Sequence, residues 1–325
     1  MKRQLGRSGI EVSAMGIGTW AIGGPWDFGT SPAGWGDVDD EESVAALRAA
    51  FESGVSFFDT AANYGTGHAE RIVARAFAGL GDEVVIATKF GYRIDEEKKQ
   101  VTQYDRAEDV VDHLHKDCEA SLRRLDTDVI DLYQFHINEY PVEQAAAVRD
   151  ALEELVAAGK VRYHGWSTDN PAGARVFAQG DHCVAVQNNM NVVHDAPEIL
   201  AMCDEFDMAS LNRGPLGMGM LTGKYSRETV FTANDVRSVD WFKNQFQGPI
   251  LENLPAIREV LTAEGRTLAQ GALAWVWARS GRTIPIPGVR NVAQVDENTR
   301  AMAWGPLTEA QMTEIETLIE RPSGR

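Results

Sequence analysis

Short apolar runs alternate with longer segments of helical periodicity along most of this chain, and this alternation restricts the possible fold more than any other feature. The order of strand and helix patterns is typical of a parallel sheet whose strands are joined by helical crossovers. The apolar runs predict eight strands, at Met15–Gly18, Phe57–Asp59, Val84–Thr88, Val129–Phe135, Val161–Trp166, Val184–Gln187, Met208–Asn212 and Thr283–Pro285. Eight strands in this arrangement predict a (β/α)8 barrel of the TIM type.

The segments between the strands carry helix start and stop signals. Helices are predicted at Glu41–Ser53, Ala69–Ala78, Arg106–Leu125, Pro141–Ala158, Pro171–Ala178 and Pro197–Phe206. Gly54, Gly79 and Gly159 stand where a left-handed residue would end three of these helices. Before the first barrel strand, Arg3–Leu5 and Glu11–Ala14 are separated by a turn and predict a short N-terminal hairpin.

Two long segments do not follow the alternation. Gly24–Asp39 is rich in Gly, Trp and Asp, and Lys224–Pro249 is polar with scattered aromatic residues. Loops of this length in a compact domain are usually functional lids or poorly ordered. No linker, repeat or low-complexity tract separates two halves, so we expect residues 1–325 to form a single domain.

Charge and cysteine content narrow the classes of function. The chain has 31 Lys and Arg against 48 Asp and Glu, a net charge of −17, which disfavours nucleic acid and anionic membrane surfaces as partners. The three cysteines show no metal-type spacing and are expected to be buried in a reducing compartment. Without a signal-peptide core or a long apolar run, the sequence predicts a cytoplasmic protein and no membrane span.

Polar side chains follow three successive strands of the predicted barrel. Asp59 ends the second strand and Tyr64 follows on its loop, Lys89 ends the third strand, and His136 ends the fourth. Because active sites of such barrels lie at the carboxyl ends of the strands, we expect these four residues to lie close together.

Each of these side chains has a possible task in carbonyl reduction. A tyrosine with an ordinary pKa of about 10 is a weak acid at neutral pH, and a nearby Lys89 ammonium would lower that pKa. Asp59 would hold Lys89 charged, while His136 could donate a hydrogen bond to the carbonyl oxygen and orient the substrate. Taken singly, each residue is equally consistent with a cap, a solvated cation or a packed side chain. Their joint placement at one barrel mouth favours the catalytic interpretation.

These motifs resemble the aldo-keto reductase family. The resemblance rests on Asp59–Gly65 with Gly67–Glu70, on Ala87–Lys89 and on Asp131–His136, and it extends from Leu5 to about Thr308. It implies that Tyr64 is the general acid/base, that Asp59 and Lys89 support it, and that His136 orients the substrate. The opening Gly16–Trp20 and the Arg-Gly-Pro-Leu loop are most similar to the bacterial branch that includes general stress proteins and sugar or polyol reductases.

The same resemblance implies a nicotinamide cofactor, NADP with NAD as a possibility. Ser167 and Gln187 would bind the carboxamide, the loop from Arg213 the pyrophosphate, and Arg290 a 2′-phosphate. The predicted cofactor-binding residues are Thr19, Trp20, Asp59, Ser167, Thr168, Gln187, Arg213, Gly214, Pro215, Leu216, Gly217, Lys224, Gly288, Arg290, Gln294, Glu297 and Asn298. Trp20, Trp26, Trp35, Tyr64 and His136 are predicted to contact the substrate.

Three positions depart from the common family pattern. Thr168 stands where many relatives have Asn, Ile137 where a Trp is frequent, and Gln294 where an Arg often holds the 2′-phosphate. Thr168 changes the edge of the predicted cofactor site, and Ile137 changes the wall of the predicted substrate pocket. The third weakens the preference for NADP over NAD and leaves Arg290 as the main phosphate ligand.

The sequence leaves three functions to compare. The first is an NADP(H)-dependent carbonyl reductase acting on small aldehydes, ketones, sugars or polyols. The second is a cofactor-binding sensory or auxiliary subunit with little turnover. The third is a metal-dependent barrel hydrolase or a phosphate-binding isomerase. The hydrolase would need His and Asp ligands at strand ends, and among the histidines only His136 is at such a position. We therefore expect a reductase without a metal site; the oligomeric state and the physiological substrate stay open.

Overall fold

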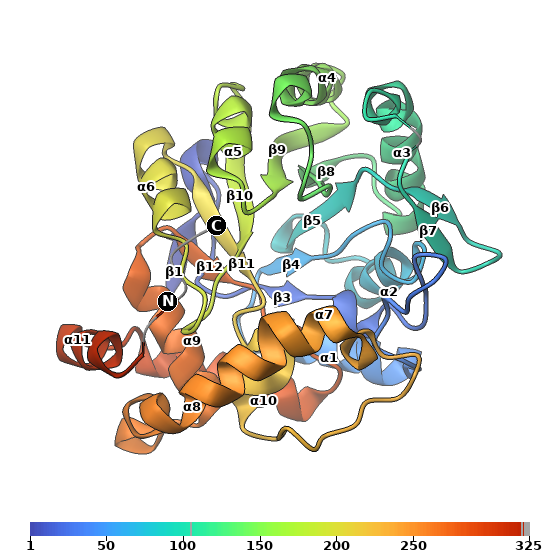
Figure 1. Cartoon of the computed structure of the whole chain (residues 1–325). Helices are drawn as coiled ribbons and strands as arrows, with labels where there is room; N and C mark the ends of the chain where they lie inside the picture. The colour runs from blue at the N-terminus through green and yellow to red at the C-terminus, as the bar shows by residue number, and fades with distance from the viewer. Residues whose placement is uncertain (105, 320, 322–325) are drawn as a thin grey trace.

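Eight parallel strands curve into the predicted barrel (Figure 1). The computed structural model describes residues 1–104, 106–319 and 321. The barrel strands are β3 (Ile17–Gly18), β4 (Phe57–Asp59), β5 (Val85–Phe90), β8 (Ile130–Phe135), β9 (Val161–Ser167), β10 (Cys183–Asn189), β11 (Ala209–Arg213) and β12 (Thr283–Pro285). They are hydrogen-bonded in the order β12-β11-β10-β9-β8-β5-β4-β3. The predicted strands and fold class are therefore confirmed.

Backbone hydrogen bonds between the first and the last strand close the barrel. The amide of Gly16 donates to Pro285 O over 3.0 Å, and the amide of Gly18 donates to Pro287 O over 3.1 Å. Gly18 has to be a glycine at this seam, because a Cβ there would lie 2.9 Å from Ile286 O. These bonds join the two edge strands of the eight-stranded sheet.

The barrel has an apolar filling and a larger apolar layer outside the strands. Side chains such as Phe57, Leu132 and Ile284 point inward and form one buried cluster. The alternating side chains of the strands pack against the surrounding helices in a second and larger cluster. Burial on both faces explains why the strands read as nearly continuous apolar runs in the sequence.

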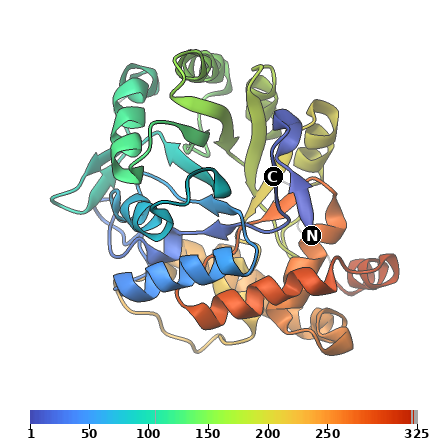
Figure 2. The same ribbon diagram turned by 180° about the vertical axis from the view of Figure 1, so that it is seen from behind.

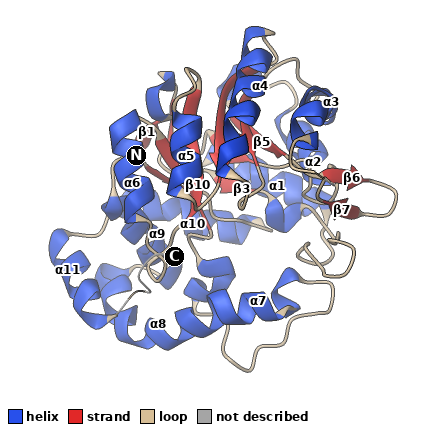
Figure 3. Cartoon of the chain, turned by 45° about the horizontal axis from the view of Figure 1, so that its top comes forward, coloured by secondary structure: helices blue, strands red, loops and turns tan. Residues whose placement is uncertain are grey.

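Helices surround the barrel, as Figures 1 and 3 show. The first six are α1 (Asp40–Glu52), α2 (His68–Phe77), α3 (Asp109–Leu125), α4 (Ala145–Ala157), α5 (Pro171–Ala178) and α6 (Pro197–Phe206), close to the predicted bounds. Gly54 and Gly159 have φ values of 88° and 71° just after α1 and α4, as predicted for left-handed caps. One prediction was wrong in detail: Pro141 precedes a 3-10 turn at Val142–Gln144, and α4 begins only at Ala145.

The last part of the chain contains helices whose bounds the sequence analysis did not assign. These are α7 (Asp240–Phe242), α8 (Gly248–Leu261), α9 (Leu268–Arg279), α10 (Val292–Trp304) and α11 (Glu309–Leu318), with a π-helical turn at Lys243–Gln247. Helices α7, α8 and α9 lie between β11 and β12, while α10 follows β12 and packs beside α1 (Figure 2). The last β/α unit thus lies next to the first, as a closed barrel requires.

The N-terminal hairpin closes the amino end of the barrel. Strands β1 (Lys2–Gln4) and β2 (Glu11–Ser13) pair antiparallel, and Leu5 joins the inward-facing apolar cluster. Gly6 has φ +52° and lies so close to β10 that a Cβ would be 2.2 Å from Val184 O. With the amino end closed, the carboxyl end of the strands is the open mouth.

None of the helices in the described ranges is long and apolar enough to cross a bilayer. The cysteines Cys118, Cys183 and Cys203 are buried and free, as expected, and burial raises the pKa of each thiol to about 12.

Candidate active site

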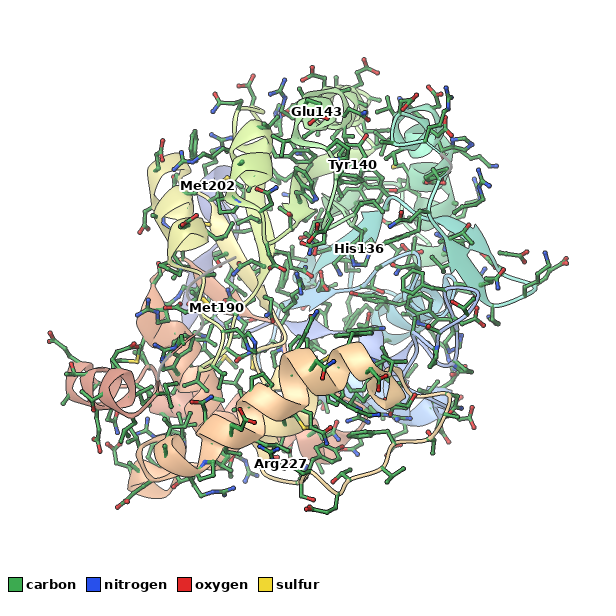
Figure 4. All side chains as sticks on the ribbon, viewed as in Figure 1. His136, Tyr140, Glu143, Met190, Met202 and Arg227 are labelled. Atoms are coloured by element: carbon green, nitrogen blue, oxygen red, sulfur yellow. The ribbon has the colours of Figure 1, made fainter. Side chains whose placement is uncertain are left out.

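A cleft of about 640 Å³ opens at the carboxyl ends of the barrel strands. Most residues predicted from the sequence line it: Trp20, Trp26, Trp35, Asp59, Tyr64, His136, Ser167, Gln187, Arg213, Gly214, Pro215, Leu216, Lys224, Gly288, Arg290, Gln294, Glu297 and Asn298. Lys89 lies directly behind Tyr64 and is fully buried. Figure 4 shows His136 near the middle of the molecule, where β8 ends.

Three predicted cofactor residues do not line this cleft. Thr19 and Thr168 are completely buried, and the Thr168 hydroxyl donates to Asn138 O over 2.9 Å. Gly217 has φ +55° and packs so closely on α8 that a Cβ would be 2.2 Å from Cδ1 of Ile250. In this structure these residues shape the turns that carry the lining side chains.

Lys89 connects the strand ends through its ammonium group. Its Nζ donates to Asp59 Oδ2 over 2.6 Å, to Thr60 O over 2.9 Å and to Tyr64 Oη over 3.1 Å. An ammonium group has three N–H donors, so all of them are used. Asp59 and Lys89 are 2% and 0% exposed, which makes this a buried ion pair with saturated hydrogen bonding.

The pKa of Tyr64 differs in direction from the sequence-based expectation. Burial raises the pKa of the Tyr64 hydroxyl above its usual value, and the attraction of Lys89 opposes this effect without reversing it. The pKa of Lys89 is also raised, because Asp59 and Tyr64 together outweigh the cost of burying the ammonium. Tyr64 is therefore a protonated phenol and Lys89 a charged ammonium at neutral pH.

The second oxygen of Asp59 is held by two amide side chains. Gln134 and Gln187 donate to Asp59 Oδ1 over 3.1 Å and 2.9 Å. Gln134 had no assigned role in the sequence analysis, although its position two residues before His136 places it inside the barrel. These amides supply hydrogen bonds to the buried oxygen that Lys89 does not reach.

The ring of His136 lies beside those of Tyr64 and Tyr92. Its Nδ1 is 3.0 Å from Asn63 Oδ1, and its ring meets Tyr64 and Tyr92 edge-on with centroids 5.7 Å away in both cases. Burial lowers the pKa of His136 well below its usual value, and the charges of Lys89 and Arg213 lower it further. The imidazole is therefore neutral at pH 7. Asn63 and Tyr92 were not predicted as site residues.

A second buried charge supports the strand that carries Lys89. Glu70 is fully buried in α2; it accepts from the hydroxyl of Thr88 over 2.6 Å and from Nε of Arg124 over 2.6 Å. Thr88 precedes Lys89, so these contacts attach β5 to α2 and α3 just behind the site. In the sequence, Glu70 is recognisable only as part of the Gly67–Glu70 motif.

Arg213 and Asp169 form an ion pair at the wall of the cleft between β9 and β11. Asp169 also accepts from the backbone amide of Asn189 over 2.7 Å. Arg213 was predicted as a cofactor-binding residue, whereas Asp169 was missed because its position after the strand gives no signal of its own. The carboxylate fixes the guanidinium and offsets part of its charge.

The predicted phosphate ligand Arg290 already has partners within the chain. Its guanidinium donates to Trp35 O over 3.0 Å and to Asp37 O. Gln294 accepts from the Arg290 amide over 2.8 Å. The Lys224 Nζ lies 3.9 Å from Oε2 of Glu297. Arg290 therefore lines the cleft and also binds the segment 24–39 through the carbonyl groups of Trp35 and Asp37.

The two long segments that were expected to be lids or poorly ordered are joined to each other. Val236 N donates to Gly34 O over 2.7 Å, and the Arg237 guanidinium lies 4.6 Å from the centre of the Trp35 ring. Arg237 is paired with Asp235 over 2.8 Å. The segments 24–39 and 224–249 therefore form one continuous wall around the cleft.

No group of three or more His, Cys, Asp or Glu side chains in residues 1–104, 106–319 and 321 is placed to hold a metal ion. The titratable groups at the mouth are instead the acid, amine, phenol and imidazole described above.

Comparison with known proteins agrees with this geometry. The sequence pattern of the aldo/keto reductase family matches residues 14–320. The chain belongs to the aldo/keto reductase family. It is 32% identical to aldo-keto reductase YhdN of Bacillus subtilis over 324 residues, which covers 96% of this chain and 92% of that protein.

Solved structures of relatives show the same fold. A glycerol dehydrogenase from Gluconobacter oxydans superposes with a TM-score of 0.80 at 28% identity, covering 98% of this chain and 94% of that one. An aldo-keto reductase from Klebsiella pneumoniae, solved in complex with NADPH, gives a TM-score of 0.69 at 25% identity and covers 99% and 97% of the two chains.

The buried ion pair predicts a large effect of Lys89→Met on stability. The substitution leaves the Asp59 carboxylate without its counter-charge, and breaking a buried pair in this way costs about 3–5 kcal/mol of unfolding free energy. Urea unfolding of the variant measures this loss. The double variant Asp59→Asn/Lys89→Met removes both charges and is expected to recover more than half of the loss. If Lys89→Met costs less than about 1 kcal/mol, the ion pair described here does not exist in solution.

Proposed function

We propose that this reductase transfers a hydride reversibly between NADP(H) and an aldehyde, ketone or sugar carbonyl, with Tyr64 as the general acid/base. The whole chain acts as a single barrel domain in this proposal. The observation that carries it is the hydrogen bonding of Tyr64. Lys89 donates to Oη, and the hydroxyl proton finds no acceptor among the described residues, so it is free to be donated into the cleft.

The chain's own residues account for proton transfer and substrate orientation. A carbonyl oxygen in the cleft accepts from the Tyr64 hydroxyl, and the proton passes to this oxygen as it gains negative charge. Lys89 stabilises the phenolate that remains, since its ammonium stays on Oη throughout. Asp59 keeps Lys89 charged and aimed, and the Trp20 ring, stacked on Tyr64 at 6.1 Å, restricts the phenol. In alcohol oxidation the same steps run in reverse.

The cleft residues fit a nicotinamide cofactor, which when bound supplies or accepts the hydride. Ser167 lines the cleft, and Asn189 Oδ1 lies there buried and without a hydrogen-bond partner among the described residues. A hydroxyl and an amide oxygen suit a carboxamide, which both donates and accepts. Gln187 lines the same cleft, and its Nε2 donates to Asp59 Oδ1. The loop from Arg213, with Gly214 and Gly219 at φ 63° and 94°, and the nearby Lys224 suit a pyrophosphate.

NADP is proposed as the preferred form of the cofactor. The relative from Klebsiella pneumoniae was solved with NADPH. In this chain Arg290 lines the cleft together with Gln294, Glu297 and Asn298, and Lys224 Nζ lies 3.9 Å from Glu297 Oε2. Because the Arg290 guanidinium also donates to the carbonyls of Trp35 and Asp37, a 2′-phosphate would share Arg290 with the segment 24–39.

The first prediction of this proposal concerns the hydroxyl of Tyr64. Tyr64→Phe removes the proton donor and keeps the ring, so turnover is expected to fall about 10²- to 10⁴-fold. Cofactor binding should persist. NADPH oxidation with an aldehyde panel measures turnover, and protein fluorescence measures binding. Tyr92→Phe removes a hydroxyl from the same cleft without touching Lys89 and should lose less than about tenfold. Full turnover in Tyr64→Phe would refute the assignment.

The second prediction concerns cofactor choice. Arg290→Met removes the guanidinium, and a lost charge-assisted hydrogen bond weakens NADPH binding by about tenfold or more. NADH lacks the 2′-phosphate and should be affected much less. Fluorescence titration with both cofactors gives the ratio of their dissociation constants. Equal weakening for NADPH and NADH would mean that Arg290 acts only through the loop carbonyls and does not contact a phosphate.

A further inference from the structure

The ion pair between Asp169 and Arg213 lies in the cleft wall, and the proposed mechanism does not use its charges. Asp169 follows β9, and Arg213 ends β11. We propose that Asp169 sets the balance between oxidised and reduced cofactor: its carboxylate offsets the Arg213 cation, which alone would make the cleft favour NADPH over NADP⁺. This inference rests on the proposed function, because it takes a nicotinamide cofactor as the ligand.

Both carboxylate oxygens of Asp169 are held by groups that can only donate. Oδ1 accepts from the backbone amide of Asn189 over 2.7 Å, and Oδ2 accepts from Nη2 of Arg213. A backbone N–H and a guanidinium have no acceptor, so the direction of both hydrogen bonds is fixed by chemistry. The next residue, Asn170, caps α5 by accepting from two backbone amides of that helix. Asp169 is thus held between the ends of β9, β10 and β11.

The ion pair lies beside the groups that suit the nicotinamide. Asn189 and Arg213 are direct neighbours across the β10–β11 pair. Ser167 is the last residue of β9, two positions before Asp169. These four residues all line the same cleft. A carboxamide bound by Ser167 and Asn189 therefore brings its ring close to the ion pair.

The charge of Arg213 acts on groups in the middle of the cleft. Burial has the largest influence on the pKa values of Tyr64, Tyr92 and His136, and the Arg213 cation acts to lower each of these pKa values. The side chains of Arg213 and Asp169 are 32% and 43% exposed, so water screens the pair only in part. A ligand in the cleft therefore responds to a change in either charge.

The oxidised and reduced cofactors differ by one charge at the ring. The nicotinamide of NADP⁺ is a pyridinium cation, whereas the dihydronicotinamide of NADPH is neutral, and the phosphates are the same in both. A nearby cation therefore weakens the binding of NADP⁺ relative to NADPH, and a nearby carboxylate has the opposite effect. Arg213 and Asp169 together place little net charge beside the ring. Neither direction of hydride transfer is then strongly disfavoured.

Fluorescence titration of the purified protein with NADP⁺ and with NADPH tests the inference without turnover. Asp169→Asn keeps an acceptor for the Asn189 amide and removes the charge. The ratio Kd(NADP⁺)/Kd(NADPH) should therefore rise about three- to tenfold, as expected for one partly screened charge. Asp169→Glu keeps the charge and should stay close to the wild-type ratio. This matched pair tests the inference without any change at Arg213.

Arg213 provides the complementary test. Arg213→Gln leaves the Asp169 carboxylate without its counter-charge and should lower the ratio about three- to tenfold. The double variant Asp169→Asn/Arg213→Gln removes both charges and should return close to the wild-type ratio. The same shift has to appear in the midpoint potential of the bound cofactor, where a tenfold change in the ratio is about 30 mV for a two-electron couple. Asp169→Asn should move this potential to a more positive value.

The outcomes separate this inference from the proposed function. A purely structural role would weaken NADP⁺ and NADPH alike and leave the ratio unchanged, which would overturn the inference alone. A ratio that moves in the same direction in Asp169→Asn and Arg213→Gln would also overturn it, because opposite charges must act with opposite sign. A wild type that binds neither cofactor contradicts the proposed function and this inference together.

Discussion

The buried ammonium of Lys89 is the interaction on which the site depends. Three groups from the segment 59–64 at the end of β4, the Asp59 carboxylate, the Thr60 carbonyl and the Tyr64 hydroxyl, take its three N–H donors. A charge at 0% exposure is tolerable only with such complete pairing, and Gln134 and Gln187 extend the pairing to the other oxygen of Asp59. Because Lys89 already donates to Oη, the Tyr64 proton has to be offered elsewhere. The arrangement thereby directs it into the cleft.

The strand pairing of the barrel fixes the relative positions of the side chains around Lys89. Asp59 and Lys89 lie at the ends of the adjacent parallel strands β4 and β5, and Gln134 lies next to Lys89 across the β5–β8 pair. Gln187, from β10 on the far side of the barrel, reaches the same carboxylate. Thr88 is attached to Glu70 and through it to Arg124, so the strand below Lys89 is fixed to α2 and α3. A displacement of any of these strands would leave a buried polar group without its partner.

The parts of the structure that follow local periodicity could be predicted from the sequence. Strand ends converge in any parallel barrel, so Asp59, Tyr64, Lys89 and His136 could be placed together from their positions alone. Interactions between distant segments could not. Nothing near Asn63, Asp169 or Tyr92 shows that their side chains turn toward His136 or Arg213. The pKa of Tyr64 was expected to fall because the charge of Lys89 was visible in the sequence, whereas the larger effect of burial was not.

The pH dependence of carbonyl reduction tests the central claim most directly, because it reports which groups titrate in the site. Tyr64 must be protonated to act as an acid, and its pKa is raised above the usual value of about 10, so the rate should fall only at still higher pH. His136 has a pKa well below its usual range and stays neutral, so it should add no step. The account predicts a flat profile of kcat/KM from about pH 6 to about pH 9. An inflection near neutral pH that disappears in His136→Gln would contradict it.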